Sequence, residues 1–150
     1  MAKPQEIHVF HSDYSLRKVF TMVEDFHSAF KIEEKPKFDT VDPQTAALRF
    51  KLLQEENKEY LEACADMDKV AIADALGDLL YVLIGTMRVH GMEDLIYPIF
   101  KEIHKSNMSK LDEDGKPIYR EDGKVMKSAR FSAPNLQSII TRYETGTPIW

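Results

Sequence analysis

The stretch from Asp66 to His90 sets the strongest condition on how this 150-residue chain can fold. Its apolar residues recur at helical spacing after Asp66 or Asp68, either of which can cap a helix, and Gly91 is a natural stop. The second half of this helix is apolar on nearly every side. Other helices of the same chain or of a partner must therefore cover it, which predicts a central helix in an all-α fold.

Three further helices are predicted from the same periodicity. They run from Ser15 to Ile32 after an Asp13 or Ser15 cap, from about Gln44 to Cys64 after Asp42 or Pro43, and from Glu93 to about Met108. Pro98 falls inside the last of these, so a kink or a later start is expected there. The expected architecture is one domain over residues 1–150, resembling a four-helix bundle, with a helical core at about 15–108.

The remainder, from about residue 109 to 150, is predicted to be irregular and basic. Two Asp-Gly pairs, at Asp114 and Asp122, are turn signals that suggest a short hairpin. The cations of this tail are Lys110, Lys116, Arg120, Lys124, Lys127 and Arg130. A solvated surface is the ordinary explanation for such a run, whereas an anion site nearby would favour phosphate binding.

The composition narrows the class of protein. A formal charge of -5 gives no bulk positive field for nucleic acid or an anionic membrane, so neither partner is expected. The single cysteine, Cys64, excludes an intrachain disulfide. The first residues do not resemble a secretion signal, and the apolar run from Leu79 to Met87 is too short to span a bilayer. A cytoplasmic protein is expected.

Acidic residues interrupt two of the predicted helices at spacings that place them on shared faces. Glu55 and Glu56 lie four and three residues before Glu59, and Asp74 lies four before Asp78. Asp78 is flanked by leucines on a helix that is expected to be buried. Because burying unpaired carboxylates costs several kcal/mol, something must compensate them.

Two kinds of compensation are open. Arg49, Lys51 and Lys58 lie on the same helix as the glutamates and could form ordinary salt bridges. Alternatively, two antiparallel helices that each present an acidic pair would make a cage of oxygen ligands for Mg²⁺ or Mn²⁺. Zinc and di-iron sites are disfavoured, because there is one cysteine and a single Glu-x-x-His pair, Glu24 and His27.

The segments "EENKEYLEA" and "DALGDLLYVLIGT" together resemble the MazG-like and phosphoribosyl-ATP pyrophosphohydrolase-like all-α superfamily. Its signature is Glu-Glu-x-x-Glu on one helix and Glu-x-x-Asp on the next. The first half matches here, but Ala75 stands three residues before Asp78 in place of the second signature's glutamate. Asp74 is the available acid. With the tail segment "SNMSKLDEDGKPIYREDGKV", the resemblance covers about Leu16 to Lys124.

This resemblance implies a reaction and a set of roles. Members of the superfamily cleave nucleoside triphosphates between the α- and β-phosphates with Mg²⁺, for which Mn²⁺ can substitute, and serve nucleotide-pool control. Glu56, Glu59 and Asp78 would hold the metal, with Asp74 as the replacement for the missing glutamate. Glu55 would be a further ligand or the base that orients water, which with Glu56 makes the catalytic pair.

The resemblance also assigns residues to the substrate and implies a homodimer or a dimer-based homotetramer. Asn107 and Lys110, three residues apart on the fourth helix, are expected to hold phosphate oxygens on one face, with Lys124 as a further cation. Tyr81 is one turn beyond Asp78 and could reach a sugar or base, but a buried core tyrosine is the expected role. The competing function is a non-hydrolytic helical module for nucleotide sensing or oligomerisation, which the Asp74-Ala75 departure favours.

Overall fold

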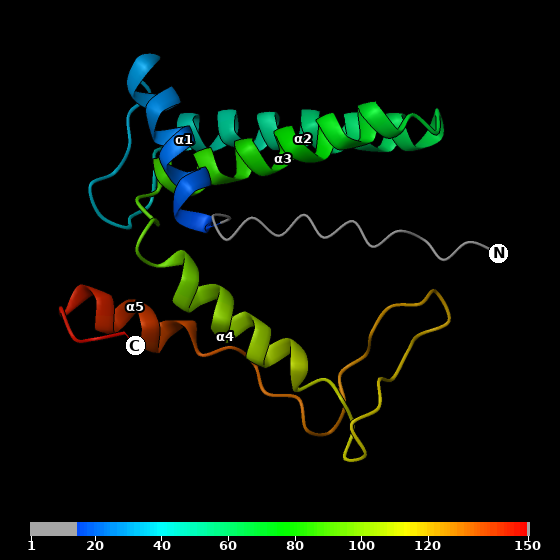
Figure 1. The fold of residues 1–150 in the computed structure, drawn as a ribbon. Helices are drawn as coiled ribbons and strands as arrows, with labels where there is room; N and C mark the ends of the chain where they lie inside the picture. The colour runs from blue at the N-terminus through cyan, green and yellow to red at the C-terminus, as the bar shows by residue number, and fades with distance from the viewer. Residues whose placement is uncertain (1–14, 150) are drawn as a thin grey trace. The chain divides into compact units, whose positions relative to one another are not determined.

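The computed structural model describes residues 15–149. Within this range the chain forms five helices: α1 (Leu16–Ala29), α2 (Pro43–Ala65), α3 (Lys69–Val89), α4 (Ile96–Met108) and α5 (Leu136–Glu144) (Figure 1). The same range has no strand, only one isolated bridge between Tyr119 and Val125. The expectation of an all-α fold is confirmed, whereas the four-helix bundle arrangement stays a prediction. The Asp13 alternative for the first cap lies outside the described residues.

The chain divides into two compact units, one ending at Gly91 and the other beginning at Met92. The first unit contains α1, α2 and α3, and the second contains α4, α5 and the segment between them. Whether the two units act as the single domain expected from the sequence stays a prediction. Each unit is considered by itself below.

An antiparallel helical hairpin, α2 and α3, forms the main body of the first unit (Figure 1). Asp42 caps α2 by accepting hydrogen bonds from the backbone N–H groups of Gln44 and Thr45, and Pro43 occupies the first turn, where its missing N–H costs nothing. Asp68 caps α3 in the same manner. The two helices therefore begin and end within about a residue or two of the predicted positions.

Helix α1 packs on α3 through an apolar face whose Phe20 and Val23 are each 1% exposed. Ser15 caps this helix, as one of the two sequence alternatives predicted, by accepting from the Lys18 N–H at 3.4 Å. This packing covers one side of α3 at its C-terminal end.

A buried polar network ties the three helices together near that end. Arg88 donates to both carboxylate oxygens of Glu34, at 2.7 and 2.8 Å, and His27 Nδ1 lies 2.7 Å from the same carboxylate. Arg49 of α2 reaches across to α3, donating to the Val82 carbonyl at 2.7 Å and to the Thr86 hydroxyl at 3.0 Å. These bonds fix the register of α2 on α3, and therefore the positions of the acidic residues farther along the hairpin.

Within residues 15–149 the covering of α3 is incomplete, so its expected enclosure by other helices of this chain or of a partner stays a prediction. Leu76, Leu80 and Leu83 recur at helical spacing and are 46%, 51% and 38% exposed. By length and composition alone, α3 would also be able to cross a membrane. Helix α3 is longer than the apolar run from Leu79 to Met87, so the short length of that run does not exclude a membrane span.

The second unit begins with α4, which starts three residues later than the periodicity suggested. Pro98 is its third residue, within the first turn, where a proline breaks no intrahelical hydrogen bond, so the later start is confirmed. The predicted hairpin is also present around the second Asp-Gly pair: Arg120 N–H donates to the Lys124 carbonyl at 2.8 Å. Gly123 adopts a φ of 83°, which favours glycine in this turn.

The expectation of an irregular tail over residues 109–150 is wrong for one segment, since α5 forms there. Asn135 caps it by accepting from the Ser138 N–H at 3.2 Å. Leu136, Ile139 and Tyr143 then recur at three- and four-residue spacing, a short amphipathic pattern. Helix α5 lies against α4, where Glu102 accepts from the Asn135 N–H at 3.0 Å.

Candidate functional site

The hairpin brings the acidic residues of α2 and α3 into one cluster. Glu55, Glu56 and Glu59 project from α2, and Asp74 and Asp78 project from the antiparallel α3. Glu56 is half-buried, whereas the other four are exposed. The expectation that Asp78 is buried is therefore wrong: Leu76 and Leu80 beside it are themselves exposed, and the carboxylate that loses water is Glu56.

Glu56 is the electrostatic centre of this acidic cluster. Its Oε2 atom is buried without a hydrogen-bond partner within the described range. Burial raises the pKa of the Glu56 carboxyl, and the negative charges of the neighbouring acids raise that pKa further, in the order Glu59, Asp78, Glu55 and Asp74. All five acids are thus close enough to interact through Glu56. A buried carboxylate oxygen with no donor is rare and needs an explanation.

The salt-bridge explanation finds no support in the structure of residues 15–149. Arg49 is committed to the α3 backbone and Thr86, and Lys58 pairs instead with Glu62, at 3.3 Å and one turn further along α2. No ion pair within that range involves any of the five clustered acids. The negative charge of the cluster is therefore not neutralised by the cations that the sequence offered.

The donor set of the cluster suits a hard cation. Carboxylate oxygens are the ligands of Mg²⁺, which also keeps several waters. Over the part of the chain that the structure describes, no three such side chains converge as a preformed metal site. The pair Glu24 and His27 instead engages the buried network, since Glu24 lies 3.4 Å from Arg88 and His27 binds Glu34.

Ala75 takes up the position where the superfamily signature has glutamate. It is 3% exposed, while its neighbour Asp74 faces solvent. The Coulombic effect of Asp74 on Glu56 shows that this neighbouring acid belongs to the cluster. Asp74 is thus available for the role that the signature gives to the glutamate.

The predicted substrate residues Asn107, Lys110 and Lys124 all belong to the second unit, so their approach to the acidic cluster stays a prediction. Asn107 is exposed in the last turn of α4. Lys110 lies beyond the end of that helix, so the argument from a shared helical face is wrong for this pair. A turn nevertheless keeps them together, because the Lys110 N–H donates to the Asn107 carbonyl at 3.2 Å.

Tyr81 is partly exposed rather than a buried core residue. Its ring meets the edge of Phe26 from α1 at a centroid distance of 5.7 Å, and Phe30 packs on Phe26 at 4.4 Å. This exposed aromatic group lies one turn of α3 beyond Asp78. Sequence reasoning named Tyr81 but did not predict its contact with Phe26, or the packing of Phe30, the C-cap residue of α1, on Phe26.

The fold and the cluster together define an all-helical protein that presents carboxylates from two antiparallel helices. Comparison with known families specifies the class further. Residues 23–107 match the phosphoribosyl-ATP pyrophosphohydrolase family, and the chain belongs to it. The match covers α2 and α3, the second half of α1 and most of α4. The superfamily resemblance is thereby confirmed, and the family indicates a hydrolase of the pyrophosphohydrolase kind.

The name of one similar protein states no function. The chain is 30% identical over 102 residues to the uncharacterized protein L479 of Acanthamoeba polyphaga mimivirus. The matched region is 68% of this chain, but it spans only 37% of that relative's length.

Proposed function

We propose that this protein is a Mg²⁺-dependent nucleoside triphosphate pyrophosphohydrolase, which cleaves an NTP or dNTP into the monophosphate and pyrophosphate. The observation that carries the proposal is the buried, unpartnered Oε2 atom of Glu56 among four further carboxylates. An uncompensated cluster of this kind lowers stability, so its retention is best explained by a bound cation. Family membership supplies the class of reaction.

In this proposal Glu56, Glu59 and Asp78 hold the cation, and Asp74 replaces the glutamate that is absent at position 75. Bound Mg²⁺, or Mn²⁺ in its place, supplies charge neutralisation for the triphosphate and acidifies water. Glu55 is exposed beside Glu56 and accepts a proton from the attacking water or serves as a further ligand. The catalytic pair is thus Glu55 and Glu56.

The substrate's phosphates need cations beyond the metal. Lys110 and Asn107, held together by their turn, donate to phosphate oxygens in this proposal, and Lys124 adds a further charge. Tyr81 supports the sugar or base with its partly exposed ring. The overall negative charge of the chain makes such local cations necessary.

The exposed leucine face of α3 supports a homodimer or a dimer-based homotetramer. A membrane is a poor cover for this helix, because Asp74 and Asp78 lie within it and the adjacent α2 carries charged residues along its length. A second copy would cover the leucines and leave the acids accessible. The proposed location is the cytoplasm.

The decisive experiment incubates the protein with each common NTP and dNTP and Mg²⁺, and detects pyrophosphate separately from orthophosphate. Pyrophosphate is expected from one or a few nucleotides. Asp78→Asn should lose most of the turnover while remaining folded, and Glu62→Gln, which is outside the cluster on α2, should retain it. Orthophosphate as the sole product would contradict α–β cleavage, and full activity of Asp78→Asn would contradict the site.

A second candidate is a helical module that binds nucleotides without hydrolysing them. The alanine at position 75 favours it, since the signature's glutamate is replaced there by a small buried side chain. Nucleotide-dependent stabilisation without any released phosphate would support this candidate against the enzyme.

A further inference from the structure

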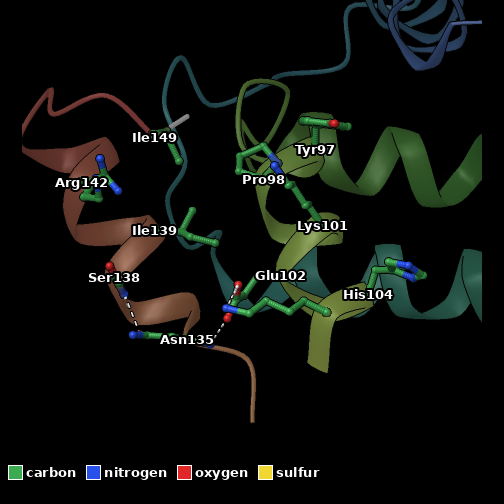
Figure 2. A pocket seen from close by; sticks show the side chains of 11 residues that line it. Tyr97, Pro98, Lys101, Glu102, His104, Asn135, Ser138, Ile139, Arg142 and Ile149 are labelled. Atoms are coloured by element: carbon green, nitrogen blue, oxygen red, sulfur yellow. Dashed lines mark hydrogen bonds and ion pairs between the residues drawn. The ribbon is translucent and has the colours of Figure 1, made fainter. Parts of the chain in front are cut away.

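The second unit contains a pocket that the proposed hydrolase does not use. It lies between α4 and α5, with a volume of about 740 Å³. Figure 2 shows its walls: Tyr97, Pro98 and Lys101 come from α4, and Ile139 and Arg142 come from α5. A pocket of this size is within the range that holds small organic molecules, roughly 300–1,000 Å³. None of the acidic residues of the hairpin lines it.

The polar lining of the pocket carries an excess of positive charge. Lys101, Lys105 and Arg142 contribute three cations, against one carboxylate, that of Glu102. Glu102 is already engaged, because it accepts from the Asn135 N–H at 3.0 Å and lies 3.8 Å from Lys105 Nζ. Over residues 15–149, neither Lys101 nor Arg142 makes an ion pair. In a chain of net charge -5, this local concentration of cations is a distinct feature.

The remaining lining combines the polar side chains of His104, Asn135 and Ser138 with an apolar wall. Pro98 is buried, and Ile139 and Ile149 are half-buried and project into the space between the helices (Figure 2). Cations alone would suit any anion, including inorganic phosphate. The apolar wall beside the cations contributes to binding only if the ligand also has an organic part whose apolar surface is buried against it.

We propose that the α4–α5 pocket binds an organic phosphate, with Lys101 and Arg142 contacting the phosphate and Ile139 and Ile149 contacting the organic part. Arg142 suits phosphate through its planar set of donors, and Lys101 contributes a mobile point charge. The site is separate from the acidic hairpin in residue content and needs no metal. It is therefore independent of the hydrolytic function proposed above.

The test titrates AMP, inorganic phosphate and adenosine into the full chain in EDTA, which prevents metal-bridged binding at the acidic cluster. Isoleucine methyl NMR locates binding through the signals of Ile139 and Ile149. AMP should shift both signals with a Kd below about 1 mM. The single variants Lys101→Gln and Arg142→Gln should each weaken AMP binding about tenfold or more, since each removes a charge-assisted contact.

Lys116→Gln is the matched control, because Lys116 is an exposed lysine of the same unit that does not line the pocket. It should bind AMP as the unmodified chain does. The proposal is overturned if AMP leaves the two methyl signals unchanged at 5 mM, roughly five times that Kd limit, or if both charge variants bind AMP normally. Equal affinity for inorganic phosphate would overturn the assignment to an organic phosphate, and equal affinity for adenosine would overturn the role of the cations.

Discussion

Replacing Glu56 by glutamine should stabilise the protein while abolishing its proposed activity. Glutamine keeps the size of the side chain but removes the charge that four neighbouring carboxylates oppose. Like-charge pairs at helical spacing cost a few tenths of a kcal/mol each. With solvent screening of the exposed neighbours, the total relief is about 1 kcal/mol near neutral pH. For a chain of this length, that corresponds to a rise in Tm of roughly 2–4 °C.

The stabilisation expected for Glu56→Gln depends on pH, and the raised pKa of Glu56 sets the direction of that dependence. The pKa of Glu56 is raised above its ordinary value of 4.5, so between that value and the raised one the folded state binds more protons than the unfolded state. The contribution of Glu56 to stability therefore falls as the pH rises through this window, and its destabilising effect is complete above it. The advantage of Glu56→Gln should be largest at pH 7 and should fade as the pH approaches 4.5.

Thermal unfolding followed by circular dichroism in EDTA, at pH 7 and at pH 4.5, measures this difference. Glu62→Gln is the matched control, since Glu62 lies on the same helix but is paired with Lys58 and should lose a little stability. Adding Mg²⁺ at pH 7 should raise the Tm of the unmodified protein more than that of Glu56→Gln. A Glu56→Gln variant that is no more stable at pH 7 in EDTA would refute the electrostatic account.

Three further outcomes are expected. Gly85→Ala should lower stability by about 1–3 kcal/mol in denaturant titrations, because the added Cβ would meet Arg49 Nη2 at 2.8 Å and His27 Nε2 at 3.1 Å inside the buried network. Burial lowers the pKa of His27 below 6.5, so the stability that its neutral form contributes should be lost as the pH falls below about 6.5. A His27→Asn variant should therefore show a flatter dependence of stability on pH in thermal unfolding. Leu80→Lys, on the exposed face of α3, should convert the proposed oligomer to monomer in light scattering, and an unchanged mass would contradict that interface.

The helices of the first unit were predictable because their signals are local. Asp42 and Asp68 cap the two hairpin helices where the sequence places them, and periodicity fixes what lies between. Helix α5 was not predicted because it is only nine residues long and follows a segment rich in turn signals and charge. Its Asn135 cap and its spaced apolar residues were the signal that could have revealed it.

The membership of the acidic cluster was predictable from spacing, but its burial was not. Helical periodicity places Glu56 and Glu59 on one face without saying which carboxylate the facing helix will desolvate. That depends on the register of α2 on α3, which Arg49 sets through contacts 33 and 37 residues away in sequence. The sequence suggested Arg49 as a partner for the acids, whereas in the structure it aligns the helices that carry them.

The same register explains why the acid on α3 stands at position 74 rather than 75. Ala75 is nearly fully buried in the hairpin, as is Ala63 of α2, and small side chains at such positions let two helices approach closely. A glutamate at 75 would place a longer, charged side chain in that buried position, close to the charge of Glu56. Asp74 lies one residue away in solvent yet still raises the pKa of Glu56. Ala75→Glu alone should therefore destabilise the hairpin, and removing Asp74 at the same time should recover part of the loss by relieving repulsion within the cluster.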